Sequence, residues 1–254
     1  MAHRRLLSAA LFAALSCGVL SAPPRAAAEP YGQFHRGQDQ WHVIETQYFR
    51  IYYTQDTPRS AAYLRGLADR TFERLNAFYG YKPERKIRVV IVGYTAFSNG
   101  FADSDHDHIT IFTSAPDFHS RSRVPWFDNV FTHELSHILS LNTATHFYKR
   151  VPLVLGTGLA RFAQAQTLIK LPIYGRNFPH WFAEGVAQFD TSLLGRDSYD
   201  ENRAALQRAI WEDDWMFGLD KLAFFGGEQW YNTGFSFLRF LEQKYGKGTV
   251  HRLF

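Results

Sequence analysis

The sequence predicts an α+β fold, in which a small mixed β-sheet with one helix is followed by a mainly helical half. Short runs of β-branched and aromatic residues flank one long segment of helical periodicity between residues 43 and 113. From Trp126 onward the apolar residues recur at helical spacing almost to the end. Strands grouped before helices are typical of α+β domains. A chain of 254 residues, 46% hydrophobic, can also bury a sizeable core.

The first strand is expected over residues 43–53, which are rich in β-branched and aromatic side chains. A helix should follow, with Thr57 as its N-cap, a proline in its first turn and Gly80 as its stop. The aliphatic run 87–92 predicts a buried strand. A shorter strand is expected over 109–113 after a loop, which completes the sheet half.

The helical half is expected to contain a helix around residues 127–138, a second one beginning near 180 and a third over 202–211. A further helix over 235–245 should end at a glycine, and residues 249–254 resemble the start of another. Because a chain seldom ends at the start of a helix, we expect this sequence to be the front of a longer protein.

Residues 1–28 are predicted to be a secretory signal peptide, which leaves residues 29–254 as the mature domain. A short basic start precedes an apolar run over 6–20, and the alanines at 26–28 form a cleavage site. This run is shorter than the roughly 20 apolar residues that span a bilayer. An uncleaved anchor helix and a lipoprotein modified at Cys17 are the alternatives. We expect a secreted protein of a bacterial periplasm.

The charge balance and the cysteine count limit which partners and which kinds of metal site the chain can have. The chain has 28 Lys and Arg against 24 Asp and Glu, and three of the arginines lie in residues 1–28. The mature domain is therefore nearly balanced in charge, which gives no sign of a nucleic-acid partner. The only cysteine, Cys17, lies in the same leader. Any metal in the mature domain must consequently be held by histidines and carboxylates.

Residues 133–137 form an HExxH motif within a helical apolar stripe. On a helix, His133 and His137 share one face about 6 Å apart, near enough for both imidazoles to bind one ion. Glu134 would lie beside that ion as a general base toward water. The alternative is a helix that carries two surface histidines and a glutamate without a metal.

A third ligand is expected downstream, because catalytic zinc keeps three protein ligands and one open position. A metzincin would place a glycine and a third histidine at positions that Ser140 and Thr143 occupy here. Glu184 lies among aromatic and aliphatic residues, where burial of a carboxylate is unfavourable unless it meets a cation. Gly185 would let this second helix approach the metal helix closely.

These motifs resemble the gluzincin metallopeptidases of the peptidase MA clan, in which two helices supply His, His and Glu to zinc. The sequence Trp-Phe-Ala-Glu-Gly-Val-Ala over 181–187 carries this resemblance together with the HExxH motif. Tyr231, in Tyr-Asn-Thr-Gly-Phe, is similar to the aminopeptidase N-like pattern Tyr-x-x-Gly-aromatic. The resemblance implies a thermolysin-like catalytic domain with zinc ligands His133, His137 and Glu184, the base Glu134 and the oxyanion donor Tyr231.

The layout also resembles the N-terminal peptidase-like domain of bacterial proteins that continue into a TolB-like β-propeller. Shared features include the strand–helix–strand opening and Asn-Gly-Phe-Ala over 99–102. This resemblance implies a C-terminal propeller that is missing from the chain. Two departures matter. Glu184 lies 47 positions beyond His137, and the aminopeptidase motif Gly-x-Met-Glu-Asn does not precede the metal helix. Exopeptidase specificity is therefore not supported.

Weaker signals complete the set of expectations. The apolar segment 151–171 is expected to be an extra packing helix, with a lid or a membrane-surface element as the alternative. The acidic and histidine-rich residues 103–108 are expected to form a solvated turn, with a second metal or substrate-amine site as the alternative. Gln188 is a candidate to hydrogen-bond the second nitrogen of a ligand histidine, with an ordinary helix-surface amide as the alternative. His180 could approach the site from the start of the same helix, but a capping or surface role is the favoured expectation.

The expected function is zinc-dependent hydrolysis of peptide bonds in a peptide or protein substrate, through a metal-activated water. If the strand 109–113 forms the sheet edge beside the cleft, it would hold an extended peptide by main-chain pairing. The alternative is a non-catalytic periplasmic scaffold or binding module that retains a metal site.

Overall fold

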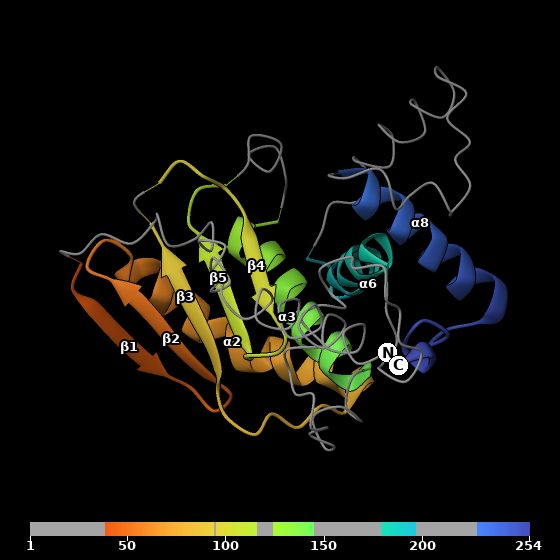
Figure 1. Cartoon of the computed structure of the whole chain (residues 1–254), viewed down its shortest axis with the longest axis horizontal. Helices are drawn as coiled ribbons and strands as arrows, with labels where there is room; N and C mark the ends of the chain where they lie inside the picture. Colours follow the sequence, from red (N-terminus) through yellow and green to blue (C-terminus); the bar gives the residue numbers. More distant parts are fainter. Residues whose placement is uncertain (1–38, 94, 116–123, 145–178, 197–227) are drawn as a thin grey trace, which may run out of the picture. The chain divides into compact units, whose positions relative to one another are not determined.

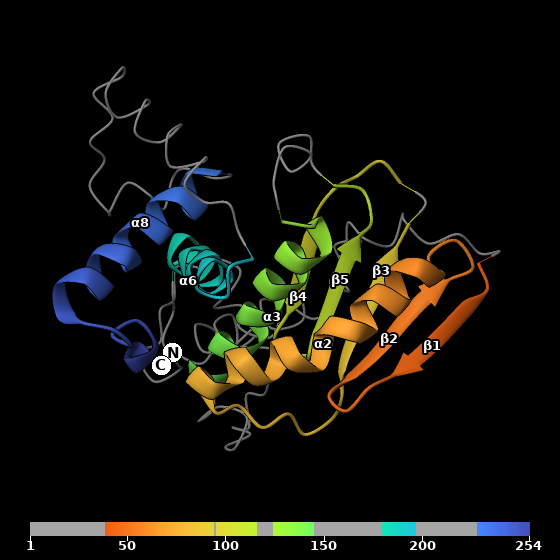
Figure 2. The same ribbon diagram turned by 180° about the vertical axis from the view of Figure 1, so that it is seen from behind.

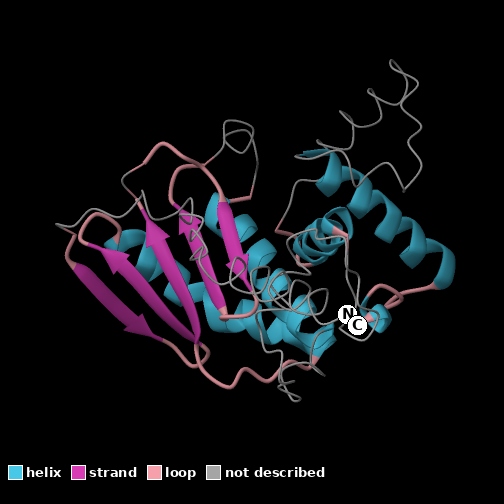
Figure 3. Ribbon diagram, viewed as in Figure 1, coloured by secondary structure: helices cyan, strands magenta, loops and turns pink. Residues whose placement is uncertain are grey.

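The computed structural model describes residues 39–93, 95–115, 124–144, 179–196 and 228–254 (Figure 1). The predicted leader, the apolar segment 151–171 and the predicted helix 202–211 lie outside these residues. Within residues 40–254, which form one compact unit, the structure has a five-stranded mixed sheet and, among the described residues, four α-helices (Figure 3). The mixed α/β architecture is confirmed at this level.

The sheet has the strand order β1-β2-β3-β5-β4. Its strands are β1 (Trp41–Glu45), β2 (Phe49–Thr54), β3 (Ile87–Val92), β4 (Gly100–Asp103) and β5 (His108–Phe112). The three central strands β2, β3 and β5 are parallel, and the two edge strands β1 and β4 are antiparallel to their neighbours. The strands predicted over 87–92 and 109–113 are confirmed, the second with a shift of one residue.

Helix α2 (Pro58–Tyr79) agrees with the predicted helix, and its apolar stripe is buried. Proline in the first turn loses no intrahelical hydrogen bond there, because the first N–H groups of a helix have no partner within it. Gly80 ends the helix in the left-handed conformation (φ 63°), and its N–H donates to the carbonyl of Asn76. Thr57 stands at the N-cap, but its side chain bonds with the backbone of Thr54 instead of the helix.

The single strand expected over 43–53 is wrong, because β1 and β2 form an antiparallel hairpin in this region. A side chain distant in sequence, Asp69 of α2, holds the turn. Its carboxylate accepts a hydrogen bond from the hydroxyl of Thr46 at 2.7 Å. The backbone N–H groups of Gln47 and Tyr48 donate to the same carboxylate. A tertiary contact therefore makes a turn that has no glycine, proline or asparagine.

Helices α2 and α3 (Trp126–Ala144) cover one face of the sheet, as Figure 2 shows from behind. Alternate strand residues point toward these helices and are fully buried in the main core. The fully buried strand residues of this core are Phe49, Ile51, Ile87, Val89, Ile91, Ile109 and Ile111. Phe131, Leu135 and Ile138 of α3 pack against them. The core thereby fixes one side of α3 and directs its other side away from the sheet.

β4 lies within a stretch expected to be a loop, and it forms the edge of the sheet beside β5. The expectation that the strand over 109–113 forms this edge is therefore wrong. The turn after β4 agrees with the predicted turn, and the carboxylate of Asp103 accepts from the N–H groups of Asp105 and His106. Asp107, at φ 48°, is instead buried and accepts hydrogen bonds from Tyr81 and Asn142.

Helices α6 (His180–Leu193) and α8 (Glu228–Tyr245) pack against each other, and a short 3-10 helix, η4 (His251–Leu253), follows. α8 begins seven residues before the predicted start at 235, and only one 3-10 turn forms where another helix was expected. A second core joins these elements, with Val186, Phe189, Phe235, Leu238 and Val250 as its buried members.

Gly185 does permit a close approach of helices, but its partner differs from the expected one. A Cβ at Gly185 would lie 2.5 Å from the carbonyl carbon of Gly234 in α8. A Cβ at Gly234 would lie 2.2 Å from the carbonyl oxygen of Trp181. Both distances are too short for any side chain, so the two glycines set the spacing of α6 and α8. The expectation that Gly185 faces the metal helix is wrong.

None of the helices that the structure describes is both long and apolar enough to traverse a lipid bilayer.

Candidate metal centre

His133 and His137 lie one turn apart on α3, and their rings are 4.9 Å apart between centroids. Both residues are buried, and only 9% and 11% of their side-chain surfaces are exposed. Their burial follows from the position of α3, which packs between the sheet on one side and α6 on the other. The alternative of two surface histidines is therefore wrong.

Glu184 of α6 reaches both imidazoles, although it lies 51 positions beyond His133 and 47 beyond His137. Its Oε2 atom lies 3.0 Å from Nε2 of His133 and 3.2 Å from Nε2 of His137. The two Nε2 atoms are themselves 3.2 Å apart. Three ligand-type atoms from two helices thus form a nearly equilateral triangle, as the sequence predicts.

This triangle has the dimensions of one face of a metal coordination sphere. Tetrahedral zinc with bonds of about 2.0–2.1 Å holds its ligand atoms ~3.3 Å apart. The three atoms can therefore share one ion with small adjustments, and the group of His133, His137 and Glu184 could hold a metal ion. No other such group of three or more occurs among the residues the structure describes, so nothing there supports a second metal at 103–108.

The electrostatics of the group reflect a carboxylate buried against two imidazoles. Burial would raise the pKa of Glu184, but the nearby His137 and His133 side chains hold it well below its usual range. Burial would lower the pKa of His137, but the Glu184 carboxylate outweighs this and raises it to about 9. The negative charge of Glu184 is thus stabilised, and it favours a cation between these three groups.

Glu134 is buried beside the triangle and lies against the start of β4. A Cβ at Gly100 would come within 2.6 Å of its Oε1 atom and 2.8 Å of its Cγ atom. The absent side chain at Gly100 therefore makes the space in which Glu134 is held. Burial raises the pKa of the Glu134 carboxyl above its usual value, although the neighbouring histidines oppose this. A carboxylate with a raised pKa is a better proton acceptor.

Tyr231 of α8 also reaches the site, and its ring lies 5.5 Å from that of His133. Burial raises the pKa of its hydroxyl, and the carboxylates of Glu184 and Glu134 raise it further. The hydroxyl is therefore protonated at neutral pH and can donate a hydrogen bond. All five principal residues predicted from sequence thus lie close together: His133, Glu134, His137, Glu184 and Tyr231.

The two weaker candidates differ in position. His180 lies at the exposed start of α6, where its ring stacks on that of Trp230 at 5.4 Å. Gln188 lies one turn after Glu184 on the same helix and is partly buried. A contact between either of them and a ligand side chain stays a prediction.

Asp190 is a central residue that sequence reasoning missed. This fully buried carboxylate accepts hydrogen bonds from Tyr79 at 2.7 Å and from Ser136, which lies between the two histidines on α3. His251 bonds its other oxygen at 2.8 Å. Asp190 therefore ties α6 to α2, α3 and η4, less than two turns from Glu184. A weaker signal than that of Glu184 was available, since the residues one helical turn from Asp190 are apolar, namely Val186, Ala187 and Leu193.

Replacing Asp190 with Asn should weaken metal binding as well as folding. An amide cannot accept from all three donors, so we expect a loss of about 1–3 kcal/mol in the free energy of unfolding. Because α6 is then less firmly held on α3, metal affinity should fall by roughly tenfold, at the low end of the effect of residues that orient ligands. Competition with a chelator measures that affinity.

Asp69→Asn provides the matched control, because Asp69 also accepts three hydrogen bonds but holds the β1–β2 turn. It should lower stability and leave metal affinity unchanged. Equal metal affinity in the wild type and Asp190→Asn would show that Asp190 has no part in positioning Glu184.

Comparisons of the chain with protein-family models and with curated proteins find no match. The functional argument therefore rests on the geometry of the described residues and on the sequence motifs.

Proposed function

We propose that the chain is a zinc-dependent peptidase of the gluzincin type, which hydrolyses peptide bonds in a peptide or protein substrate. The observation that carries the proposal is the triangle of ligand atoms from His133, His137 and Glu184, with sides of 3.0–3.2 Å. Glu134 and Tyr231 beside this triangle supply the two further functions that such a reaction needs. The HExxH motif and the sequence around Glu184 support the same assignment.

Zinc is the proposed metal because the donor set consists of two imidazole nitrogens and one carboxylate oxygen. Three protein ligands leave room for water or substrate, whereas structural zinc sites are usually closed by four. Zinc in such a site supplies Lewis acidity, which makes a water molecule acidic near neutral pH and polarises a carbonyl group.

Glu134 is proposed as the general base. Its raised pKa and its burial beside the triangle suit a group that accepts a proton from the attacking water. The same carboxyl can then deliver this proton to the leaving amine, which completes the cleavage. Because residue 100 is a glycine, no side chain there pushes the Glu134 carboxylate back toward its own helix, α3.

β4 is the proposed docking strand for the substrate. It is one of the two edge strands of the described sheet, and it is the one whose first residue, Gly100, contacts Glu134. An extended peptide that adds to this edge by main-chain hydrogen bonds would run past the base. This assignment replaces the strand over 109–113, which lies inside the sheet.

Tyr231 is proposed to donate a hydrogen bond to the substrate carbonyl oxygen as that oxygen becomes negatively charged. Tyr231→Phe removes only the hydroxyl, so kcat should fall by about 10²–10³-fold, as for the loss of other oxyanion donors, while KM changes little. Tyr245→Phe is the matched control, since Tyr245 is an exposed tyrosine of the same helix. Steady-state kinetics that give the same kcat for Tyr231→Phe and the wild type would refute the role.

The competing hypothesis is a scaffold or binding module that retained the metal site without catalysis. Hydrolysis of unfolded casein separates the two. A peptidase should cleave casein, lose this activity when a chelator is added and regain it with zinc. A chain that binds zinc but leaves casein intact under all these conditions would support the scaffold.

Export to a bacterial periplasm belongs to the same proposal and rests on residues 1–28. Membrane-surface contact through 151–171 and a C-terminal β-propeller stay predictions.

A further inference from the structure

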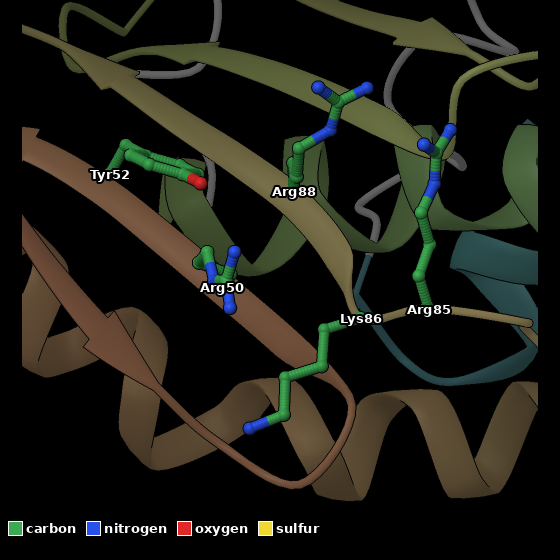
Figure 4. A pocket seen from close by; sticks show the side chains of 5 residues that line it. All are labelled: Arg50, Tyr52, Arg85, Lys86 and Arg88. Atoms are coloured by element: carbon green, nitrogen blue, oxygen red, sulfur yellow. The ribbon is translucent and has the colours of Figure 1, made fainter.

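A basic hollow of about 430 Å³ lies on the face of the sheet opposite α2 and α3. Arg50, Tyr52, Arg85, Lys86 and Arg88 line it (Figure 4). These residues come from β2, from β3 and from the segment that leads into β3. The metal-ligand triangle lies on α3 and α6, so the hollow is a separate feature of the molecule.

The strand register brings the positive charges together. Arg50 and Arg88 are paired positions of the parallel strands β2 and β3, and their side chains lie on the face away from the core. Their neighbours along the strands, Ile51, Ile87 and Val89, are buried on the opposite face of the sheet, which the helices cover. Like charges at paired positions of a sheet are destabilising. The pairing of two arginines is therefore unfavourable unless anions lie nearby, and Glu45, the partner of Arg50 on β1, supplies one of them.

The hollow contains more positive charge than the one carboxylate bound to its lining residues neutralises. Glu45 of β1 is bound by Arg50 at 2.7 Å and by Lys86 at 3.0 Å. These two cations hold the pKa of Glu45 below its usual value. Arg85 and Arg88 bind a neutral group, which leaves their positive charges in place. Both donate hydrogen bonds to the carbonyl oxygen of His106, at 3.0 Å and 2.9 Å.

Arg88 also has a hydrogen-bond donor without an acceptor. Its Nε atom is buried and has no hydrogen-bond partner. A buried donor without an acceptor is unfavourable, and an anion in the hollow could supply the acceptor. The carbonyl of His106 meanwhile fixes the guanidinium groups of Arg85 and Arg88 near each other, so that they present several N–H donors together.

We propose that this basic hollow binds a phosphate group, either as a free phosphate ion or as part of a phosphate ester. Phosphate matches the hollow because it carries up to two negative charges and several acceptor oxygens, and arginine side chains bind it through two parallel hydrogen bonds. The hydroxyl of Tyr52 adds a neutral donor to the same hollow. The inference does not depend on the peptidase proposal, because no residue of the metal site takes part.

Calorimetric titration of the full mature chain with pyrophosphate and with inorganic phosphate tests the proposal. The titration is run at low salt with a chelator present, so that the metal site does not contribute. We expect saturable binding that weakens as salt is added. The variant R50Q/R88Q should bind at least tenfold more weakly, and R50K/R88K should fall between the two because it keeps the charge and loses the planar donor groups.

R70Q/R74Q is the matched control, because it removes two exposed arginines from α2 on the other side of the sheet. It should bind pyrophosphate as the wild type does. Thermal unfolding of each variant separates lost binding from lost structure. Sedimentation with phosphatidylglycerol vesicles, against phosphatidylcholine vesicles, distinguishes a lipid phosphate from a soluble one.

If phosphatidylglycerol vesicles retain the wild type but not R50Q/R88Q, the phosphate group that the hollow binds belongs to a lipid. Binding of soluble phosphate alone would assign a free ion or a soluble ester. Equal binding by the wild type and R50Q/R88Q in both arms would overturn the proposal. So would an equal loss of binding in R70Q/R74Q, which would mean non-specific attraction to a positive surface.

Discussion

Glu134→Gln is expected to lower the rate of peptide hydrolysis by about 10²–10⁴-fold, the usual contribution of a positioned general base. Glutamine has nearly the shape of glutamate, so the space against Gly100 stays filled and α3 keeps its packing. It cannot accept the proton of an attacking water, and the reaction loses its base. The three proposed ligands are untouched, so metal content should not change.

Two measurements together check this result. Initial rates on unfolded casein report the base, and elemental analysis of the same preparations reports the metal. Glu73→Gln makes the same chemical change at an exposed position of α2 and should alter neither. Wild-type hydrolysis by Glu134→Gln would remove Glu134 from the mechanism. Loss of the metal from this variant would instead make Glu134 a ligand.

Gly234→Val is expected to cause a large loss of stability. Its Cβ would lie 2.2 Å from the carbonyl oxygen of Trp181, and backbone atoms cannot move aside as a side-chain end can. α6 and α8 must therefore separate. Overpacking of this kind destabilises by about 1–3 kcal/mol. For a domain of this size, 2–3 kcal/mol corresponds to a fall in Tm of roughly 5–10 °C.

The same separation should move Glu184 and Tyr231, which lie on the two helices concerned, so metal affinity should fall with stability. Gly66→Ala is the control for glycine replacement in a helix, because nothing lies within 4 Å of the added methyl group. It should raise stability by about 0.5–1 kcal/mol. Thermal unfolding measures both variants. A Gly234→Val protein as stable as the wild type would show that the glycine contact does not set the spacing of α6 and α8.

Elements with a strong internal pattern were predictable from sequence. The apolar stripe of α2, its proline start and its glycine stop are local signals, and so is the aliphatic run of β3. The β1–β2 hairpin was missed because its turn is made by Asp69, a residue of the following helix. β4 was missed because it has only four residues and no distinctive pattern, and its pairing with β5 defines it as a strand.

The candidate site was predictable to the extent that its chemistry is local. The i, i+4 spacing places His133 and His137 on one helical face without any tertiary information. Glu184 was identified because an ionised carboxylate among apolar side chains needs a partner. Tyr231 rested on resemblance alone, and the structure brings its ring near that of His133.

Contacts between elements were the part that sequence could not supply. Gly185 signals close packing, but only the three-dimensional arrangement identifies Gly234 as its partner. The role of Asp190 depends on three donors from three different elements. The basic hollow likewise arises from strand register, which places Arg50 beside Arg88 across 38 positions of sequence.

The metal content of the purified chain tests the central claim most directly. Elemental analysis should find about one zinc per chain in the wild type and a strong loss in both His133→Ala and Glu184→Ala, since one residue of each helix is removed in turn. His42→Ala, at an exposed position of β1, should retain the zinc. A wild-type chain that binds no divalent metal, or a Glu184→Ala chain that binds it as tightly as the wild type, would contradict the account.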